Sequence, residues 1–136
     1  GSTQTIAFWF CEKASEFQFR LGQSPYAPDD ILPLLQNNEK SELLIIGLCL
    51  ATYQGKASTN ARKFIQWLED TTSLMEEQPS LHQQLKHINY FVFGCGDSTW
   101  SNNYQKIPRF VDTALASLGA TRVCAVGEYD SMKDDL

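Results

Sequence analysis

Apolar and polar residues alternate along the chain in blocks that predict three strands. The run Leu43–Leu50 is continuously hydrophobic between polar flanks, which is typical of a strand buried on both faces. Tyr90–Phe93 and Thr121–Val126 are two further candidate strands, and each ends at a glycine, Gly94 or Gly127.

Two stretches between these strands have helical spacing instead. One follows the candidate cap Asn60 and has an apolar stripe of Ala61, Phe64, Ile65 and Leu68. The other begins near Pro108 and ends before Gly119, with a stripe of Ile107, Phe110, Val111, Ala114, Leu115 and Leu118. The polar segment Thr71–His87 is expected to be a surface excursion with a short helical turn. This alternation predicts an α/β fold with a parallel sheet and right-handed crossovers.

The first 42 residues fit two interpretations. Thr5–Cys11 has the composition of a strand. The same segment also fits one face of a helix that ends at Gly22, with apolar positions at Ile6, Phe10, Ala14, Phe17 and Leu21. Beyond it, Pro25, Pro28 and Pro33 indicate either an edge strand or a loop.

Length, charge and cysteine content narrow the class of protein. A chain of 136 residues suits one domain, expected over residues 1–136. Its net charge of −5 argues against a nucleic-acid binder and suits either a basic partner or simple solubility. The four cysteines form no Cys-x-x-Cys pair and there are two histidines, so we expect no metal site and a reducing, cytoplasmic location. The longest apolar runs are too short to span a membrane, and no signal peptide is visible. The Gly-Ser start predicts a fragment, a processed product or a tagged protein.

Two loops that follow candidate strands carry the most suggestive residues. In open α/β sheets, ligands bind at the carboxyl ends of the strands. Ala51–Gly55 and Gly94–Trp100 each combine small residues with one aromatic, Tyr53 or Trp100. Two aromatic side chains on neighbouring loops could sandwich a flat ring, although surface or packing roles would equally explain them.

Two segments that contain these loops resemble a known protein family. Ala51–Asp70 and, more strongly, Phe93–Asp130 with its FGCGDSTWSNNYQ run resemble the FMN domains of diflavin reductases. The resemblance is closest to the reductase part of self-sufficient cytochrome P-450 monooxygenase–reductase fusions. It implies a flavodoxin-like, doubly wound parallel sheet of order 2-1-3-4-5, missing or altered at both ends, and FMN as cofactor.

The resemblance also implies which residues contact the flavin. Tyr53 and Trp100 would cover the two faces of the ring. The loop near the ring's redox-active edge would be Thr52, Gln54 and Gly55. The loop at the pyrimidine end would be Cys95, Gly96 and Asp97. The tail of that loop, which would contact the flavin or brace the site, would be Asn103, Tyr104 and Gln105.

The phosphate loop of the family has two candidate positions here. One lies within Gly1–Ala7 and assigns FMN contacts to Ser2, Thr3, Gln4 and Thr5, with Thr5 in place of the family's glycine and Ile6 in place of a threonine. The other takes Thr5–Cys11 as the first strand and Glu12–Ser15 as the loop, where Glu12 would repel a phosphate. Both positions depart from the family pattern.

Two functions follow from these features. The first is an FMN-binding electron-transfer domain that relays single electrons from an FAD/NADPH reductase domain to a haem monooxygenase or similar acceptor, docking transiently through an acidic face. It needs no catalytic acid or base, and the chain alone would not turn over NADPH. The alternative is a flavodoxin-like domain that has lost FMN and serves as an interaction or scaffold module.

Overall fold

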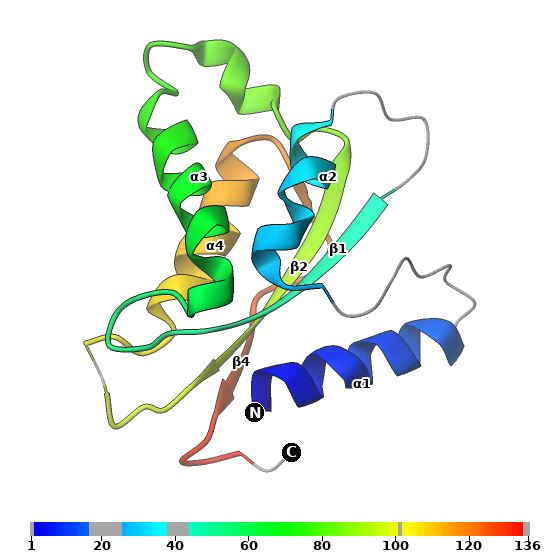
Figure 1. Ribbon diagram of the computed structural model, residues 1–136, viewed down its shortest axis with the longest axis vertical. Coiled ribbons are helices and arrows are strands. Elements are labelled where there is room, and N and C mark those ends of the chain that lie inside the picture. The colour runs from blue at the N-terminus through cyan, green and yellow to red at the C-terminus, as the bar shows by residue number, and fades with distance from the viewer. Residues whose placement is uncertain (1, 17–25, 38–43, 101, 135–136) are drawn as a thin grey trace.

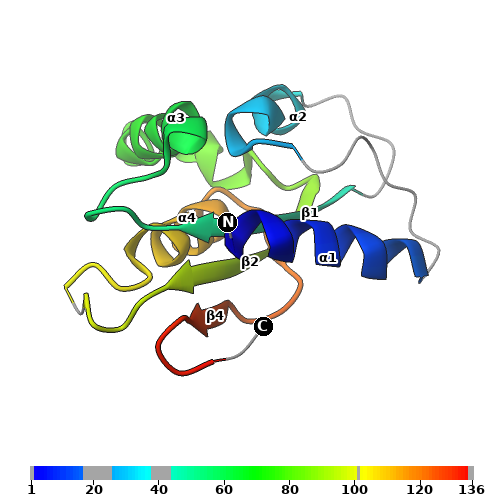
Figure 2. The same ribbon diagram turned by 60° about the horizontal axis from the view of Figure 1, so that its bottom comes forward.

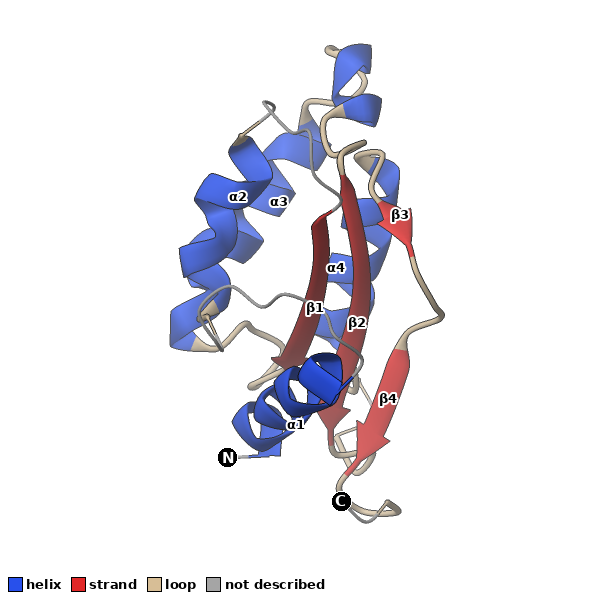
Figure 3. Cartoon of the chain, turned by 90° about the vertical axis from the view of Figure 1, so that its right-hand side faces the viewer, coloured by secondary structure: helices blue, strands red, loops and turns tan. Residues whose placement is uncertain are grey.

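A four-stranded parallel sheet forms the centre of the computed structural model, which describes residues 2–16, 26–37, 44–100 and 102–134. The long strand β2 (Ile88–Gly96) pairs with β1 (Leu44–Ala51) on one side, and with β3 (Thr121–Arg122) and β4 (Gly127–Asp130) on the other. Figure 3 shows these strands running in one direction. Within the described ranges, no strand pairs with the outer edge of β1. The α/β parallel fold predicted from the sequence is confirmed.

Three helices cover one face of this sheet and enclose the main core. They are α2 (Leu32–Gln36), α3 (Arg62–Ser73) and α4 (Lys106–Ser117), seen together in Figure 1. The core combines apolar residues of the sheet and helices, among them Leu48, Val92, Phe64, Leu68 and Leu115. The predicted apolar stripes of α3 and α4 therefore point inward. No helix of the described part is long and apolar enough to cross a membrane.

Helix α1 (Ser2–Glu16) lies on the opposite face of the sheet, as Figures 1 and 3 show. Its Phe10 ring contacts Phe91 at 5.1 Å and Phe93 at 5.7 Å between ring centroids. These two rings lie over glycines of the neighbouring strands: a Cβ on Gly47 would be 2.3 Å from Phe91 Cζ, and one on Gly127 2.5 Å from Phe93 Cδ2. The aromatic cluster between helix and sheet thus depends on strand positions without side chains.

This helix decides between the two interpretations of the N-terminal segment. Thr5–Cys11 is helical, so the strand interpretation is wrong. The predicted helical face with Ile6, Phe10 and Ala14 faces the sheet, since Ile6 is buried and Phe10 packs on the sheet. The remaining members of that face, Phe17 and Leu21, and the expected stop at Gly22 lie outside the described residues.

Two other segments differ from the sequence prediction. The proline-rich segment forms the 3₁₀ helix η1 (Pro28–Ile31) followed by α2, not an edge strand or a loop, because both prolines occupy first-turn positions and Ile31 and Leu35 reach the core. The strand expected over Thr121–Val126 stops at Arg122. The amide of Val123 still donates to the Tyr90 carbonyl of β2 at 2.8 Å, and beyond it the chain leaves the sheet and returns as β4. Pro25 lies outside the described residues. The helical turn expected within Thr71–His87 is η3 (Pro79–Gln83).

The start of α3 is capped from a distant segment. Asn60 lies in the 3₁₀ turn η2 (Thr59–Ala61), and α3 has no side-chain cap of its own. Instead, the Phe64 amide donates a 2.8 Å hydrogen bond to Asp29 Oδ1 in η1. A carboxylate at a helix N-terminus satisfies a free amide and interacts favourably with the helix dipole. Asp29 therefore joins η1 to the helix layer.

We expect Asp29→Ala to lower the free energy of unfolding by about 1–2 kcal/mol, because it removes this cap. Asp30→Ala is the matched control: Asp30 is exposed in the same turn, and its loss should change stability by less than about 0.5 kcal/mol. Urea unfolding followed by circular dichroism compares the two variants. Equal stabilities would contradict the assigned role of Asp29.

Candidate functional site

The two aromatic loops leave the sheet side by side. In the parallel pairing of β1 with β2, Ala51 lies opposite Cys95, so the loops that follow both strands begin at the same edge. Tyr53 on the first loop is 64% exposed and Trp100 on the second is 70% exposed. Large aromatic side chains that point into solvent at the carboxyl edge of a parallel sheet are available to stack on a planar ligand.

The first loop is a tight turn that requires its glycine. Tyr53 and Lys56 exchange backbone hydrogen bonds of 2.8 and 2.9 Å, and Gln54 and Gly55 between them have φ values of 50° and 78°. Positive φ at both central positions is the pattern of a type I′ turn. A Cβ on Gly55 would also be 2.8 Å from Asn103 Oδ1 of the other loop. Gly55 therefore allows both the turn and the close approach of the two loops.

Thr52 fastens the first loop to the helix that follows the second. Its Oγ1 accepts a 3.0 Å hydrogen bond from the amide of Ile107, in the first turn of α4. The residue before α4, Gln105, provides no side-chain cap. The hydroxyl of Thr52 caps the helix instead, although it lies 55 residues from Ile107 in sequence. The side chain of Thr52 is thus engaged in holding the loops together.

The second loop is built from consecutive turns. The Asp97 carbonyl accepts the Trp100 amide at 3.1 Å, and the Trp100 carbonyl accepts the Asn103 amide at 2.9 Å. The Asp97 carboxylate bonds the Thr99 amide at 2.9 Å, which is an Asx-turn. A pocket of about 190 Å³ lies against this loop, lined by Thr99, Trp100, Asn102 and Asn103. The loop therefore presents Trp100 beside an open, polar recess.

Gln105 braces this loop from below. It is fully buried with φ of 58°, and its Nε2 donates to the carbonyls of Gly94 and Tyr129, each at 3.2 Å. Its Oε1 has no hydrogen-bond partner among the described residues. A left-handed backbone conformation and a buried side-chain amide both cost folding free energy. Here the amide joins β2 to β4, and the two features together fix the shape of the loop.

Two side chains not anticipated from the sequence hold the same loop to β4. Arg109 lies 5.5 Å from the centre of the Tyr104 ring and forms a bidentate ion pair with Glu128 at 2.6 and 2.9 Å. Asp130 accepts the amides of Ser98 and Met132. A hydrogen bond with the Ser98 side chain lowers the pKa of its carboxyl, and the two amide bonds add to that shift. Both partnerships span β4 and the second loop, so no local motif could have predicted them.

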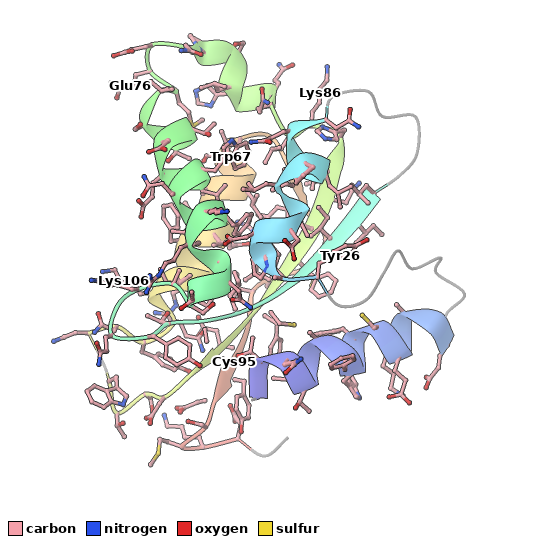
Figure 4. All side chains as sticks on the ribbon, in the orientation of Figure 1. Tyr26, Trp67, Glu76, Lys86, Cys95 and Lys106 are labelled. Atoms are coloured by element: carbon pink, nitrogen blue, oxygen red, sulfur yellow. The ribbon has the colours of Figure 1, made fainter. Side chains whose placement is uncertain are left out.

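The predicted contact residue Cys95 offers only its backbone to this edge. Its thiol is buried on the α1 side of the sheet, next to Thr3, and Figure 4 shows it near the start of α1. Burial raises the pKa of this thiol, and the hydrogen bond with Thr3 offsets part of the shift. Burial also raises the pKa of Cys49 to about 12, with the neighbouring Cys95 and Cys11 adding to it. Both thiols stay protonated at neutral pH and are poor nucleophiles.

The residues predicted for the phosphate loop form the first turn of α1. Thr3, Gln4 and Thr5 are helical, and Ser2 is the first residue of the helix. The alternative loop at Glu12–Ser15 is wrong, because those residues lie inside the same helix, and residues 2–5 likewise form a helix start in place of the loop expected there. The contact between Thr3 and Cys95 brings the N-terminus of α1 to the edge from which both aromatic loops emerge. Free amides and the dipole at a helix N-terminus attract anions such as phosphate.

The chain belongs to the flavodoxin family, whose model matches residues 1–136. It is 44% identical over 84 residues to a bifunctional cytochrome P450/NADPH–P450 reductase of Bacillus cereus, which covers 62% of this chain and 7% of that protein. Bifunctional cytochrome P450/NADPH–P450 reductase 2 of Bacillus subtilis is 33% identical over 134 residues, 98% of this chain and 11% of that protein.

A third relative, the self-sufficient cytochrome P450 monooxygenase CYP505U2 of Exserohilum turcicum, is 29% identical over 136 residues, which is the whole chain and 11% of that protein. The chain thus spans about a tenth of the length of the curated relatives it matches. The family resemblance inferred from the loop residues is confirmed, and the family match indicates FMN as the cofactor and electron transfer as the general class of function.

The described residues fit both ends of FMN, its flat ring and its phosphate. Tyr53 and Trp100 are exposed on loops joined by the Thr52–Ile107 bond, which suits a flat ring. The N-terminus of α1 reaches the same edge, which suits a phosphate. The individual contacts of Ser2, Thr3, Gln4, Thr5, Gln54, Gly96 and the other residues assigned from the sequence stay predictions.

We expect Thr52→Val to weaken FMN binding several-fold and to lower stability by about 1 kcal/mol, because the Ile107 amide loses its acceptor and the loops lose their link. Thr52→Ser keeps the hydroxyl and is the matched control. Fluorescence titration with FMN and urea unfolding measure the two effects. Valine and serine variants with the same affinity for FMN would show that the hydroxyl is not needed.

Proposed function

We propose that this chain is the FMN-binding domain of a cytochrome P450–reductase system and relays single electrons from an FAD/NADPH reductase domain to a haem monooxygenase. The observation that carries the proposal is the pair of exposed aromatic side chains, Tyr53 and Trp100, on two loops that the Thr52–Ile107 hydrogen bond links. The names of the relatives, which combine a cytochrome P450 with an NADPH–P450 reductase, supply the two partners.

In this proposal the protein positions the flavin ring and covers its two faces, and no side chain acts as an acid or a base. When bound, FMN supplies one-electron chemistry that no side chain of the site offers. Tyr53 and Trp100 stack on the ring, while Thr52, Gly55 and Gln105 keep the two loops at a fixed spacing. The protonated thiols of Cys49 and Cys95 lie beneath the sheet edge and take no part.

The exposure of both aromatic side chains has a consequence for electron transfer. A ring held between residues that are 64% and 70% exposed would keep part of its edge in contact with solvent. A partner protein could then approach that edge closely without any rearrangement of the core. The FAD/NADPH domain and the haem acceptor would each dock there transiently.

A domain that has lost FMN and serves as a scaffold is the second candidate. It is favoured by the departures at the phosphate end, where Thr5 and Ile6 replace the expected glycine and threonine and both lie within a helix. The two candidates differ in one property, which is whether the chain binds FMN.

We expect Trp100→Ala to weaken FMN binding by roughly 1–3 kcal/mol, the magnitude of stacking between an aromatic side chain and a nucleic-acid base. Trp9→Ala is the matched control, since Trp9 is an exposed tryptophan of α1 and belongs to neither aromatic loop. Quenching of flavin fluorescence gives both dissociation constants. An unchanged constant for Trp100→Ala would place the ring elsewhere, and no binding by the unmodified chain would favour the scaffold.

A further inference from the structure

Helix α1 contacts the sheet through one stripe of side chains. Thr3, Ile6 and Phe10 are three and four positions apart, so they share a face of the helix. Thr3 forms a hydrogen bond with the Cys95 thiol, and Ile6 is the one buried side chain among the described residues of α1. The opposite face is open to solvent, where Phe8 is 51% exposed. A small number of side chains therefore decides where α1 lies.

Phe10 packs on two aromatic rings of β2. The centre of its ring lies 5.1 Å from that of Phe91 and 5.7 Å from that of Phe93. These two rings lie over Gly47 and Gly127, where an added Cβ would come within 2.3 and 2.5 Å of a ring atom. Any side chain at either glycine would displace the ring above it. The two glycines thus keep both rings close to the sheet, and the position of Phe10 depends on them.

The contacts of Lys13 do not attach α1 to the sheet. Its Nζ pairs with Glu16 at 3.1 Å and lies 5.9 Å from the centre of the Trp9 ring, and both partners belong to α1. The Trp9 ring in turn meets the Phe10 ring edge-on at 5.2 Å. These contacts brace the helix internally, so packing against the sheet falls to the stripe that includes Phe10.

We propose that Phe10 is a positioning residue for the phosphate of FMN, because its packing on the β2 rings holds the N-terminus of α1 at the edge where the aromatic loops emerge. This deepens the proposed function and rests on it, since it takes the start of α1 as the phosphate end. Figure 2 shows that N-terminus beside the carboxyl end of β1. If α1 left the sheet for part of the time, the apparent affinity for the phosphate would fall with the docked fraction.

The proposal separates the two ends of the ligand. Riboflavin has the ring of FMN and no phosphate, so its binding would depend on Tyr53 and Trp100 and not on the position of α1. Loss of the Phe10 contact should therefore weaken FMN binding and spare riboflavin binding. A general loss of structure would weaken both.

The test compares the affinities of Phe10→Ala and Phe8→Ala for FMN and for riboflavin by quenching of flavin fluorescence. Each variant removes one phenylalanine from α1, but Phe8 is exposed and lies on the other face. We expect Phe10→Ala to weaken FMN binding about fivefold to tenfold and to leave riboflavin binding within about twofold. Phe8→Ala should leave both affinities within about twofold.

Three results would overturn the role of Phe10: an unchanged preference for FMN in Phe10→Ala, equal weakening of both flavins in that variant, or the same loss of preference in Phe8→Ala. Each leaves the proposed function standing, because the unmodified chain still binds FMN. If the unmodified chain bound neither flavin, the proposed function and the role of Phe10 would fail together.

Hydrogen exchange of the backbone amides gives a second readout that needs no ligand. We expect the amides of α1 to exchange several-fold faster in Phe10→Ala than in Phe8→Ala, while those of α3, on the other face of the sheet, exchange equally in both variants. Equal exchange of α1 in the two variants would show that Phe10 does not hold the helix, and would overturn the proposal.

Discussion

The parallel register of β1 and β2 is the constraint on which the rest of the structure depends. It sets Ala51 opposite Cys95, 44 residues further along the chain, so that the two loops that follow these strands emerge at one edge. Only from that starting point can Thr52 reach the Ile107 amide, Asn103 approach Gly55 and Gln105 join Gly94 to Tyr129. The buried faces of α3 and α4 hold the register by packing on the two strands. The candidate flavin site is therefore a consequence of strand pairing, refined by a few long-range hydrogen bonds.

Much of this could be predicted from the sequence, because local patterns report local structure. The apolar run Leu43–Leu50 and the spacing around Phe64 and Leu115 predicted the strand and both helices, and Gly119, with φ of 95°, follows the end of α4 as expected. The segment Thr5–Cys11 fitted two periodicities, and only the contact of Phe10 with Phe91 and Phe93 decides for a helix. The two aromatic loops could be recognised from short sequence segments. The Arg109–Glu128 ion pair and the Asp29–Phe64 hydrogen bond join residues distant in sequence, so no short segment predicts them.

The same edge combines two physical properties that suit a flavin. Exposed aromatic rings offer stacking, and a helix N-terminus offers a place for an anion. Neither of them requires a reactive side chain, which agrees with raised pKa values for the thiols of Cys49 and Cys95. The departures at Thr5 and Ile6 bear on the phosphate end alone, because the loops that would hold the ring are supported by other residues.

The most direct test of this account compares FMN with riboflavin in parallel fluorescence titrations of the chain. The two ligands share the ring and differ in the phosphate. We predict that both are quenched and that FMN binds more tightly, because Tyr53 and Trp100 hold the ring while the start of α1 holds the phosphate. Equal affinities would contradict the role of α1. No quenching by either flavin, in a chain whose circular dichroism shows it folded, would contradict the site as a whole.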